Sequence, residues 1–287
     1  MPLLSILMPT LNAAEFIEAA LGSIANQGLG AVEVVMSDGG SADGTLARAA
    51  AFGERHDLEV RILPGVDTGQ SEGLNRALAA ARGELIAWLN ANDEFAHGSL
   101  PPLVQRLVTE PRLSLVYGHH EQIDEAGRTL RWTAALPPRA WILRHESFVM
   151  NAQSMVWRRS LHERVGGFDT SLTLTMDYDL MLRFLDALDR SEVRRLDVTV
   201  GRFRRHAQQK TQSTEDAEAR REHRSIQQKL GRRSGRDHWA HLPYWWAGRT
   251  IRLWSELRFG GPRHAIGLLR LGPALLPPRA APGSGTR

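Results

Sequence analysis

Short apolar runs alternate with amphipathic stretches along the first third of the chain, and each apolar run ends in a polar loop. Apolar runs suited to buried strands lie at 3–8, 32–36, 60–63 and 85–89. Between them, apolar residues recur at helical spacing at 14–25, 44–55 and 72–82. A strand–loop–helix unit that repeats in this way favours an α/β fold with a mostly parallel sheet and helices on both faces.

The fourth apolar run becomes polar within one residue. Asn90, Asn92 and Asp93 follow it directly, and in open α/β sheets ligands bind at this carboxyl edge. A carboxylate placed there can hold a hard divalent cation, and such a cation can clamp a diphosphate. An ordinary turn is the alternative interpretation, because Asn and Asp are common turn residues.

Two other predicted strands also end in a loop with an aspartate. Asp38 follows the second strand and Asp67 follows the third. Asp43 is placed to cap the helix that comes next, whereas Asp38 has no such local role. With Asp93, three aspartates are expected at one edge of the sheet, which capping alone does not explain.

The second half of the chain continues the mixed pattern with less regular spacing. A helix, a strand, a hairpin and a last strand are predicted at 101–108, 113–118, 121–132 and 198–203, and the segment at 154–159 leads into a short helix. Another helix begins near Asp177, with Leu180 and Phe184 on its apolar face. Asp177 and Asp179 stand at its start, where carboxylates suit the helix dipole, so a capping role explains both.

Several motifs occur in an order that resembles the family 2 glycosyltransferases. They are PTLN, SDGGSADGT, DTGQSEGLNRAL and WLNANDEF, which start at Pro9, Ser37, Asp67 and Trp88. The resemblance runs from about Ser5 to Ser213. It implies the GT-A fold, with a mostly parallel, Rossmann-like central sheet flanked by helices, and a nucleotide-sugar donor.

The resemblance also implies a role for each candidate site residue. Asp177 matches the catalytic base of related enzymes, and Asp179 would cap or orient the same helix. The nucleotide would be held by Thr10, Asn12, Glu15, Asp38, Asp67 and Asn90. The sugar and diphosphate would lie near Glu72, Arg82 and Asn92. Mg²⁺ or Mn²⁺ would be bound by Asp93 and by His206, which belongs to a basic loop at 204–213 that is similar to the loop closing over the diphosphate.

Sugar transfer requires neutralisation of the departing diphosphate, a base for the acceptor hydroxyl, and alignment of the two reactants. A cation beside Asp93 and a base at Asp177 on the opposite face of the sugar imply direct displacement, which inverts the anomeric centre. We therefore expect an inverting glycosyltransferase with a UDP- or dTDP-linked donor. The acceptor would be a saccharide or a lipid-linked molecule, in the biosynthesis of a cell-surface polysaccharide or glycan.

Asn92 departs from the family pattern, which usually has aspartate at this position. An amide oxygen brings no charge, so metal binding is expected to be weaker. The alternative function is therefore a nucleotide-binding pseudo-glycosyltransferase that acts as a partner subunit, although the retained Asp177 argues against it. No G-x-G-x-x-G follows the first strand, which disfavours a dinucleotide-dependent oxidoreductase. No nucleic-acid partner is expected, because the basic residues form no recognisable module.

Length and composition predict how the chain is divided into regions and where the protein is located in the cell. The chain has 287 residues and no cysteine, which excludes disulfides and thiolate metal sites. We expect a catalytic domain at 1–213, a basic, Trp-rich helical region at 214–275 and a disordered tail at 276–287. No basic leader precedes the first strand, and no apolar run reaches the roughly 18–20 residues of a membrane span. These features predict a cytoplasmic protein. The Trp-rich region would either lie peripherally at the inner face of the membrane or pack on the catalytic domain.

Overall fold

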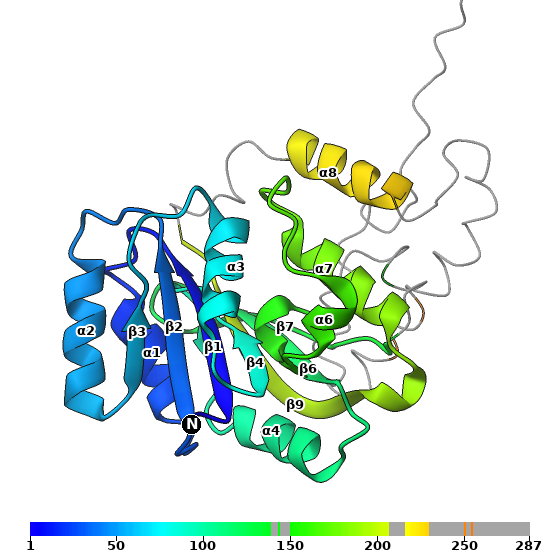
Figure 1. Ribbon diagram of the computed structural model, residues 1–287, viewed down its shortest axis with the longest axis horizontal. Coiled ribbons are helices and arrows are strands. Elements are labelled where there is room, and N and C mark those ends of the chain that lie inside the picture. The colour runs from blue at the N-terminus through cyan, green and yellow to red at the C-terminus, as the bar shows by residue number, and fades with distance from the viewer. Residues whose placement is uncertain (139–142, 144–149, 207–215, 230–249, 251–253, 255–287) are drawn as a thin grey trace, which may run out of the picture.

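One mixed β-sheet forms the centre of the protein (Figure 1). The computed structural model describes residues 1–138, 143, 150–206, 216–229, 250 and 254. Within these residues the strand order is β3-β2-β1-β4-β8-β6-β9-β5, and β7 pairs with β6. Helices cover both faces of the sheet, as the sequence predicts.

The first half of the sheet is parallel. It consists of β1 (Leu4–Thr10), β2 (Val32–Asp38), β3 (Glu59–Ile62) and β4 (Leu85–Trp88). Strand β1 pairs in parallel with β2 and β4, and β2 pairs in parallel with β3. The loops that follow these strands therefore meet at one edge of the sheet.

The second half of the sheet is mixed. Its strands are β5 (Glu94–Phe95), β6 (Leu115–Ile123), β7 (Thr129–Thr133), β8 (Met155–Arg158) and β9 (Val193–Arg204). Strand β8 is antiparallel to both β4 and β6, whereas β6 and β9 are parallel to each other. The expected parallel pairing thus holds for β1 to β4, and antiparallel strands extend the sheet beyond them.

A hydrophobic core lies on each face of the sheet, and each helix packs into one of the two cores. One face carries α1 (Ile17–Ala25), α2 (Thr45–His56) and α4 (Leu100–Thr109). The opposite face carries α3 (Gln70–Ala80), α6 (Leu161–Val165) and α7 (Met176–Ala187). Strand β1 serves both, since Ile6 and Met8 belong to the first core and Leu7 to the second, as the alternation of side chains along a strand requires.

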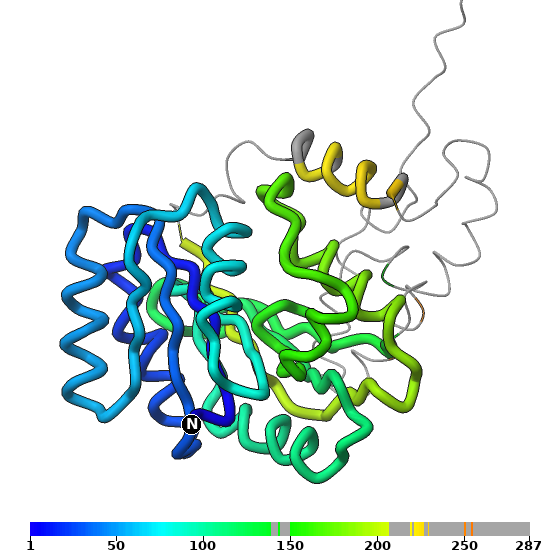
Figure 2. The backbone as a smooth tube through the Cα atoms, viewed as in Figure 1, coloured from blue at the N-terminus to red at the C-terminus, as the bar shows by residue number. Residues whose placement is uncertain are grey.

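Strand β9 brings the second half of the chain to the ligand edge of the first. It pairs with β6 over most of its length and then with β5 at Glu94 and Phe95. In Figure 2 the first half of the chain, in blue and cyan, and the second half, in green and yellow, form the two sides of one body. The end of β9 lies beside the end of β4, so His206 reaches the loop after β4.

Three more elements complete the described part of the chain. They are the 3-10 helices η1 (Ala152–Ser154) and η2 (Arg190–Glu192) and the helix α8 (Asp216–Lys229). Helix α8 lies in the region expected to be helical. The predicted disordered tail and most of the Trp-rich region after α8 lie outside the described residues. Among the helices that the structure describes, none is both long and apolar enough to cross a membrane.

Candidate active site

A cavity of about 760 Å³ lies at the carboxyl edge of the parallel strands. Residues from the loops after β1, β2, β3, β4 and β9 line it. Seven of the candidate residues are among them, namely Thr10, Asn12, Glu15, Asp67, Asn90, Asn92 and His206. Side chains far apart in the sequence are therefore gathered around one space large enough for a small-molecule ligand.

The loops after β1 and β2 are tied together by hydrogen bonds. The Asn12 N–H donates to Ser41 Oγ at 2.8 Å, and Asn12 Oδ1 accepts from the Ala42 N–H at 3.0 Å. Asn12 adopts a left-handed conformation with φ of 46°, which asparagine tolerates better than most residues. The N-cap of α2 is Gly44 and not Asp43 as expected; Asp43 stands one residue earlier, accepts from the Thr45 N–H at 3.1 Å, and ties the neighbouring loop by accepting from the Ala14 N–H at 2.9 Å.

Asp38 shapes this edge from below the cavity. Its carboxylate accepts from the N–H of Gly40 at 2.9 Å, and from the N–H and Oγ of Ser41 at 2.8 and 2.6 Å. The expectation that Asp38 has no local role was wrong, because the side chain closes an Asx-type turn. Among the described residues, the cavity lining includes Asp67 and not Asp38.

Asp67 depends on a glycine that sequence reasoning missed. Its Oδ2 accepts from Ser37 Oγ at 2.9 Å, and its N–H donates to the Asp38 carbonyl at 3.1 Å. A Cβ atom on Gly73 would lie 2.6 Å from Asp67 Oδ2. Residue 73 must therefore be glycine for Asp67 to occupy this position.

Asn90 is oriented by three side chains. Its Oδ1 accepts from Trp88 Nε1 at 2.8 Å and from Gln70 Nε2 at 2.9 Å. Its Nδ2 donates to Asp93 Oδ2 at 2.9 Å. Gln70, at the start of α3, also lines the cavity; no sequence motif indicated its role.

Asp93, the predicted metal ligand, is fully buried, with 0% of its surface exposed. Its Oδ1 accepts from the Arg204 N–H at 2.8 Å, and its Oδ2 accepts from Asn90 Nδ2 and from Gln153 Nε2 at 3.0 Å. Burial raises the pKa of Asp93 to about 7, although these hydrogen bonds act in the opposite direction. The assignment of Asp93 as a cation ligand therefore needs correction: its carboxylate joins the loop after β4 to β9 and η1, behind the cavity wall.

Asn92 and His206 face the cavity instead. Asn92 Nδ2 and His206 Nε2 are 2.6 Å apart, and the His206 ring lies 5.1 Å from that of Phe16. Burial lowers the pKa of His206 and so favours its neutral form. An amide oxygen and a neutral imidazole nitrogen fit a divalent cation as ligands, but they bring it no negative charge. Within the described ranges, no group of three or more His, Cys, Asp or Glu side chains is arranged to hold a metal ion.

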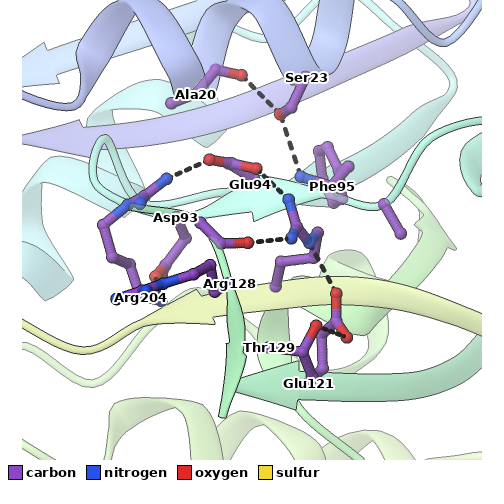
Figure 3. Close-up of polar contacts among 12 residues, drawn as sticks. Ala20, Ser23, Asp93, Glu94, Phe95, Glu121, Arg128, Thr129 and Arg204 are labelled. Carbon is purple, nitrogen blue, oxygen red and sulfur yellow. Dashed lines mark hydrogen bonds and ion pairs between the residues drawn. The ribbon is translucent and has the colours of Figure 1, made fainter. Parts of the chain in front are cut away.

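An ion-pair network supports the end of β9 (Figure 3). Glu94 pairs with both Arg202 and Arg204, and Arg202 Nε also contacts Glu121 Oε1 at 2.7 Å. The Arg204 side chain is only 3% exposed, and it donates to the carbonyl of Asn92 at 3.0 Å. The basic loop predicted to close over a diphosphate therefore begins with a structural arginine.

Arg82 lies at the opposite edge of the sheet from the cavity. It precedes β4, and its guanidinium pairs with Glu33 at 2.8 Å and with Glu59. Its predicted contact with the sugar or diphosphate is therefore corrected, because residues before a parallel strand lie at the amino edge. Glu72 accepts a hydrogen bond from the N–H of Thr68 at 2.8 Å; it supports the loop whose Thr68 lines the cavity.

Asp177 stands at the start of α7 and is partly buried. It accepts from the Tyr178 N–H at 2.7 Å, and burial raises its pKa to about 6. In the part of the chain that the structure describes, the cavity lining does not include Asp177. The preceding loop is nevertheless attached to the cavity wall, since Ser71 Oγ, one residue after Gln70, donates to the Leu172 carbonyl at 2.8 Å. Asp179 pairs with Arg183 at 2.6 Å and so stabilises the same helix.

The fold is that of GT-A glycosyltransferases. Staphylococcus aureus TarS in complex with UDP-GlcNAc matches with a TM-score of 0.63 and 17% identity, over 90% of this chain and 73% of that chain. The mannosyltransferase PcManGT from Pyrobaculum calidifontis, in complex with GDP-Man and Mn²⁺, matches with a TM-score of 0.56 and 21% identity, over 96% of this chain and 80% of that chain. The chain spans 37% of a longer TarS chain.

The family follows from the sequence. The family described as glycosyl transferase family 2 matches residues 5–166, more than half of the chain. A PGL/p-HBAD biosynthesis glycosyltransferase of Mycobacterium bovis (strain BCG / Pasteur 1173P2) is 30% identical over 183 residues, 63% of this chain and 69% of the relative. The chain therefore belongs to glycosyltransferase family 2, and the protein is a glycosyltransferase.

Proposed function

We propose that this glycosyltransferase is an inverting enzyme that moves a sugar from a nucleoside diphosphate to an acceptor hydroxyl. The observation that carries the proposal is a cavity at the carboxyl edge whose wall is bonded, through Ser71 and Leu172, to the loop before Asp177, a carboxyl group of raised pKa. Asp177 would accept the proton of the hydroxyl as the new glycosidic bond forms. A base works best when its pKa is close to the working pH, and a value of about 6 approaches that condition.

The nucleoside would occupy the part of the cavity between the loops after β1 and β3. Asp67 has one oxygen tied to Ser37, which leaves Oδ1 available to accept from an N–H of a pyrimidine base. Thr10, Asn12 and Glu15 line the same region. UDP and dTDP both carry a pyrimidine with such a group, and TarS, which shares the fold, binds UDP-GlcNAc.

A divalent cation, if bound, would be held by Asn92 and His206, and it would act as a Lewis acid on the leaving diphosphate. The structural neighbour PcManGT contains Mn²⁺. The chain's own contribution is to hold the two ligands next to each other, with Arg204 fixing the backbone of Asn92 and Phe16 packing on His206. We expect the metal to bind weakly unless the diphosphate supplies the missing negative charge.

The acceptor would be a saccharide or a lipid-linked molecule. The mycobacterial relative is named for the biosynthesis of PGL/p-HBAD, which supports a role in building a cell-surface glycan. Peripheral contact of the C-terminal region with the inner face of the membrane, and a cytoplasmic location, are part of the same proposal, because a lipid-linked acceptor would be met there.

Calorimetry with UDP- and dTDP-linked sugars, with and without Mn²⁺, tests donor binding, and NMR of the product tests inversion at the anomeric carbon. We expect micromolar to millimolar binding and a product of opposite anomeric configuration. Retention of configuration would overturn the proposed mechanism. Binding without turnover across a panel of acceptors would favour the pseudo-glycosyltransferase alternative.

A further inference from the structure

Helix α8 packs on the segment that leads into α7 (Figure 1). Ile226 is 1% exposed and belongs to the core that α7 also fills. The rings of His223 and Tyr178 lie 4.6 Å apart, and Lys229 Nζ is 2.8 Å from Asp169 Oδ2. Together these contacts attach α8 to the chain on both sides of the loop that precedes Asp177.

Glu222 is the central contact of this interface. Its Oε1 accepts from the Thr173 N–H at 2.8 Å, and its Oε2 accepts from the Leu174 N–H at 3.1 Å. The same Oε2 accepts from the N–H and the Oγ1 of Thr175 at 3.0 and 2.8 Å. Three successive N–H groups that converge on one carboxylate form an anion-binding nest, and they hold it more firmly than a single hydrogen bond would.

Thr175 is the residue directly before α7, and it makes no capping bond to its own helix. The nest around Glu222 therefore fixes the backbone immediately before the helix, two residues ahead of Asp177. Across the described residues, the lining of the cavity does not include Glu222. Any effect of Glu222 on transfer is therefore indirect, exerted on Asp177 and on the loop that precedes it.

We propose that Glu222 is a positioning residue, which fixes the loop at 173–175 and so holds Asp177 in its place for proton transfer. The inference rests on the proposed function, since it requires Asp177 to be the base. A displacement of about 1 Å in a reacting group can cost on the order of a hundredfold in rate. Glu222 also acts by charge: burial is the main cause of the raised pKa of Asp177, and the negative charge of Glu222 adds to it.

The test compares Glu222→Ala and Glu222→Gln in the full chain with Glu163→Gln, which removes an exposed carboxylate from α6. We expect kcat to fall about 10- to 100-fold in Glu222→Ala, with the Kd of the donor unchanged within about twofold. Hydrogen exchange of the amides at 173–175 should accelerate in the same variant. Glu222→Gln keeps one acceptor oxygen and should lose less activity, which gives a folded variant if Glu222→Ala is unstable.

Introducing Glu222→Ala into the Asp177→Asn protein separates positioning from general destabilisation. If Glu222 acts through Asp177, the double variant is no slower than Asp177→Asn alone. Full kcat in Glu222→Ala, or an equal loss in both backgrounds, would overturn the inference while leaving the proposed function intact. A wild-type protein that turns over no donor would refute the proposed function and this inference with it.

Discussion

Replacing Asp177 by asparagine should slow sugar transfer about a hundred- to ten-thousand-fold and at the same time stabilise the folded protein. In the unfolded chain the carboxyl group ionises near its ordinary pKa of 3.8, whereas burial raises the pKa of Asp177 to about 6 in the folded protein. The folded state therefore holds the proton more tightly. The stability that this group contributes is present below pH 4 or so, and it is lost as the pH rises through about 6.

The size of the effect follows from the same pKa values. Converting the whole difference between the two pKa values into free energy gives a penalty of at most about 3 kcal/mol for the ionised carboxylate at neutral pH. Asp177 is only partly buried, so water screens part of this penalty, and we expect Asp177→Asn to gain about 1–2 kcal/mol at pH 7.5. The asparagine Oδ1 can still accept the hydrogen bond from the Tyr178 N–H, so the fold should not suffer.

Urea denaturation of both proteins between pH 5 and pH 8, followed by circular dichroism, measures the difference. The gain in the free energy of unfolding should already reach about half of its final size near pH 5, because the penalty builds up between the two pKa values, and it should level off above about pH 7. Asp57→Asn is a matched control, because Asp57 is exposed and adopts a left-handed conformation that asparagine accepts. A variant that is less stable than wild type at pH 7.5, or a gain that does not change with pH, would refute the reasoning. Donor binding measured by calorimetry should survive in Asp177→Asn.

Three further outcomes are expected. The kcat of the wild type should fall as the pH drops below about 6, because Asp177 must be ionised to accept a proton; a flat profile down to pH 5 would count against Asp177 as the base. Gly73→Ala should weaken nucleotide binding about tenfold in calorimetry, because its Cβ would lie 2.6 Å from Asp67 Oδ2, whereas Gly22→Ala, with its nearest neighbour at 3.8 Å, should bind like wild type. Asn92→Asp should raise Mn²⁺ affinity about tenfold by titration calorimetry, because it adds a carboxylate on the cavity wall; unchanged affinity would mean that residue 92 does not face the cation.

The repeating strand–loop–helix pattern was sufficient to predict the first half of the fold. Buried parallel strands are continuous apolar runs, and β1 to β4 appear within a few residues of their predicted positions. The antiparallel insertion of β8 between β4 and β6 could not be read in the same way, because pairing between strands far apart in the chain leaves no local periodicity. The contacts of β9 with the loop after β4, such as that of Arg204 with Asp93, were therefore not predicted from the sequence.

Sequence order also fails to show which of two adjacent polar side chains faces a ligand. Asn92 lines the cavity and Asp93 is buried behind it. Both lie in a turn that the hydrogen bond from the Asp93 N–H to the Asn90 carbonyl closes, and the alternation of a strand does not set the direction of side chains there. The predicted contact of Arg82 with the sugar or diphosphate was wrong for a different reason. Arg82 precedes β4, so it lies at the amino edge of the sheet, where it pairs with Glu33 and Glu59. The role of Glu222 had no sequence signal, since its partner Thr175 is 47 residues away.

The distribution of charge around the cavity suggests how such a site can still bind a diphosphate. The acidic side chain that was expected to bind a metal, Asp93, is buried, and it accepts hydrogen bonds from the loop after β4, from β9 and from η1. The groups left facing the cavity at this point, Asn92 and His206, are neutral when His206 is unprotonated. A neutral pair neither repels the diphosphate nor holds a cation strongly in its absence. Metal and donor should therefore bind together, each raising the affinity for the other, and a titration of Mn²⁺ at several donor concentrations should show this linkage.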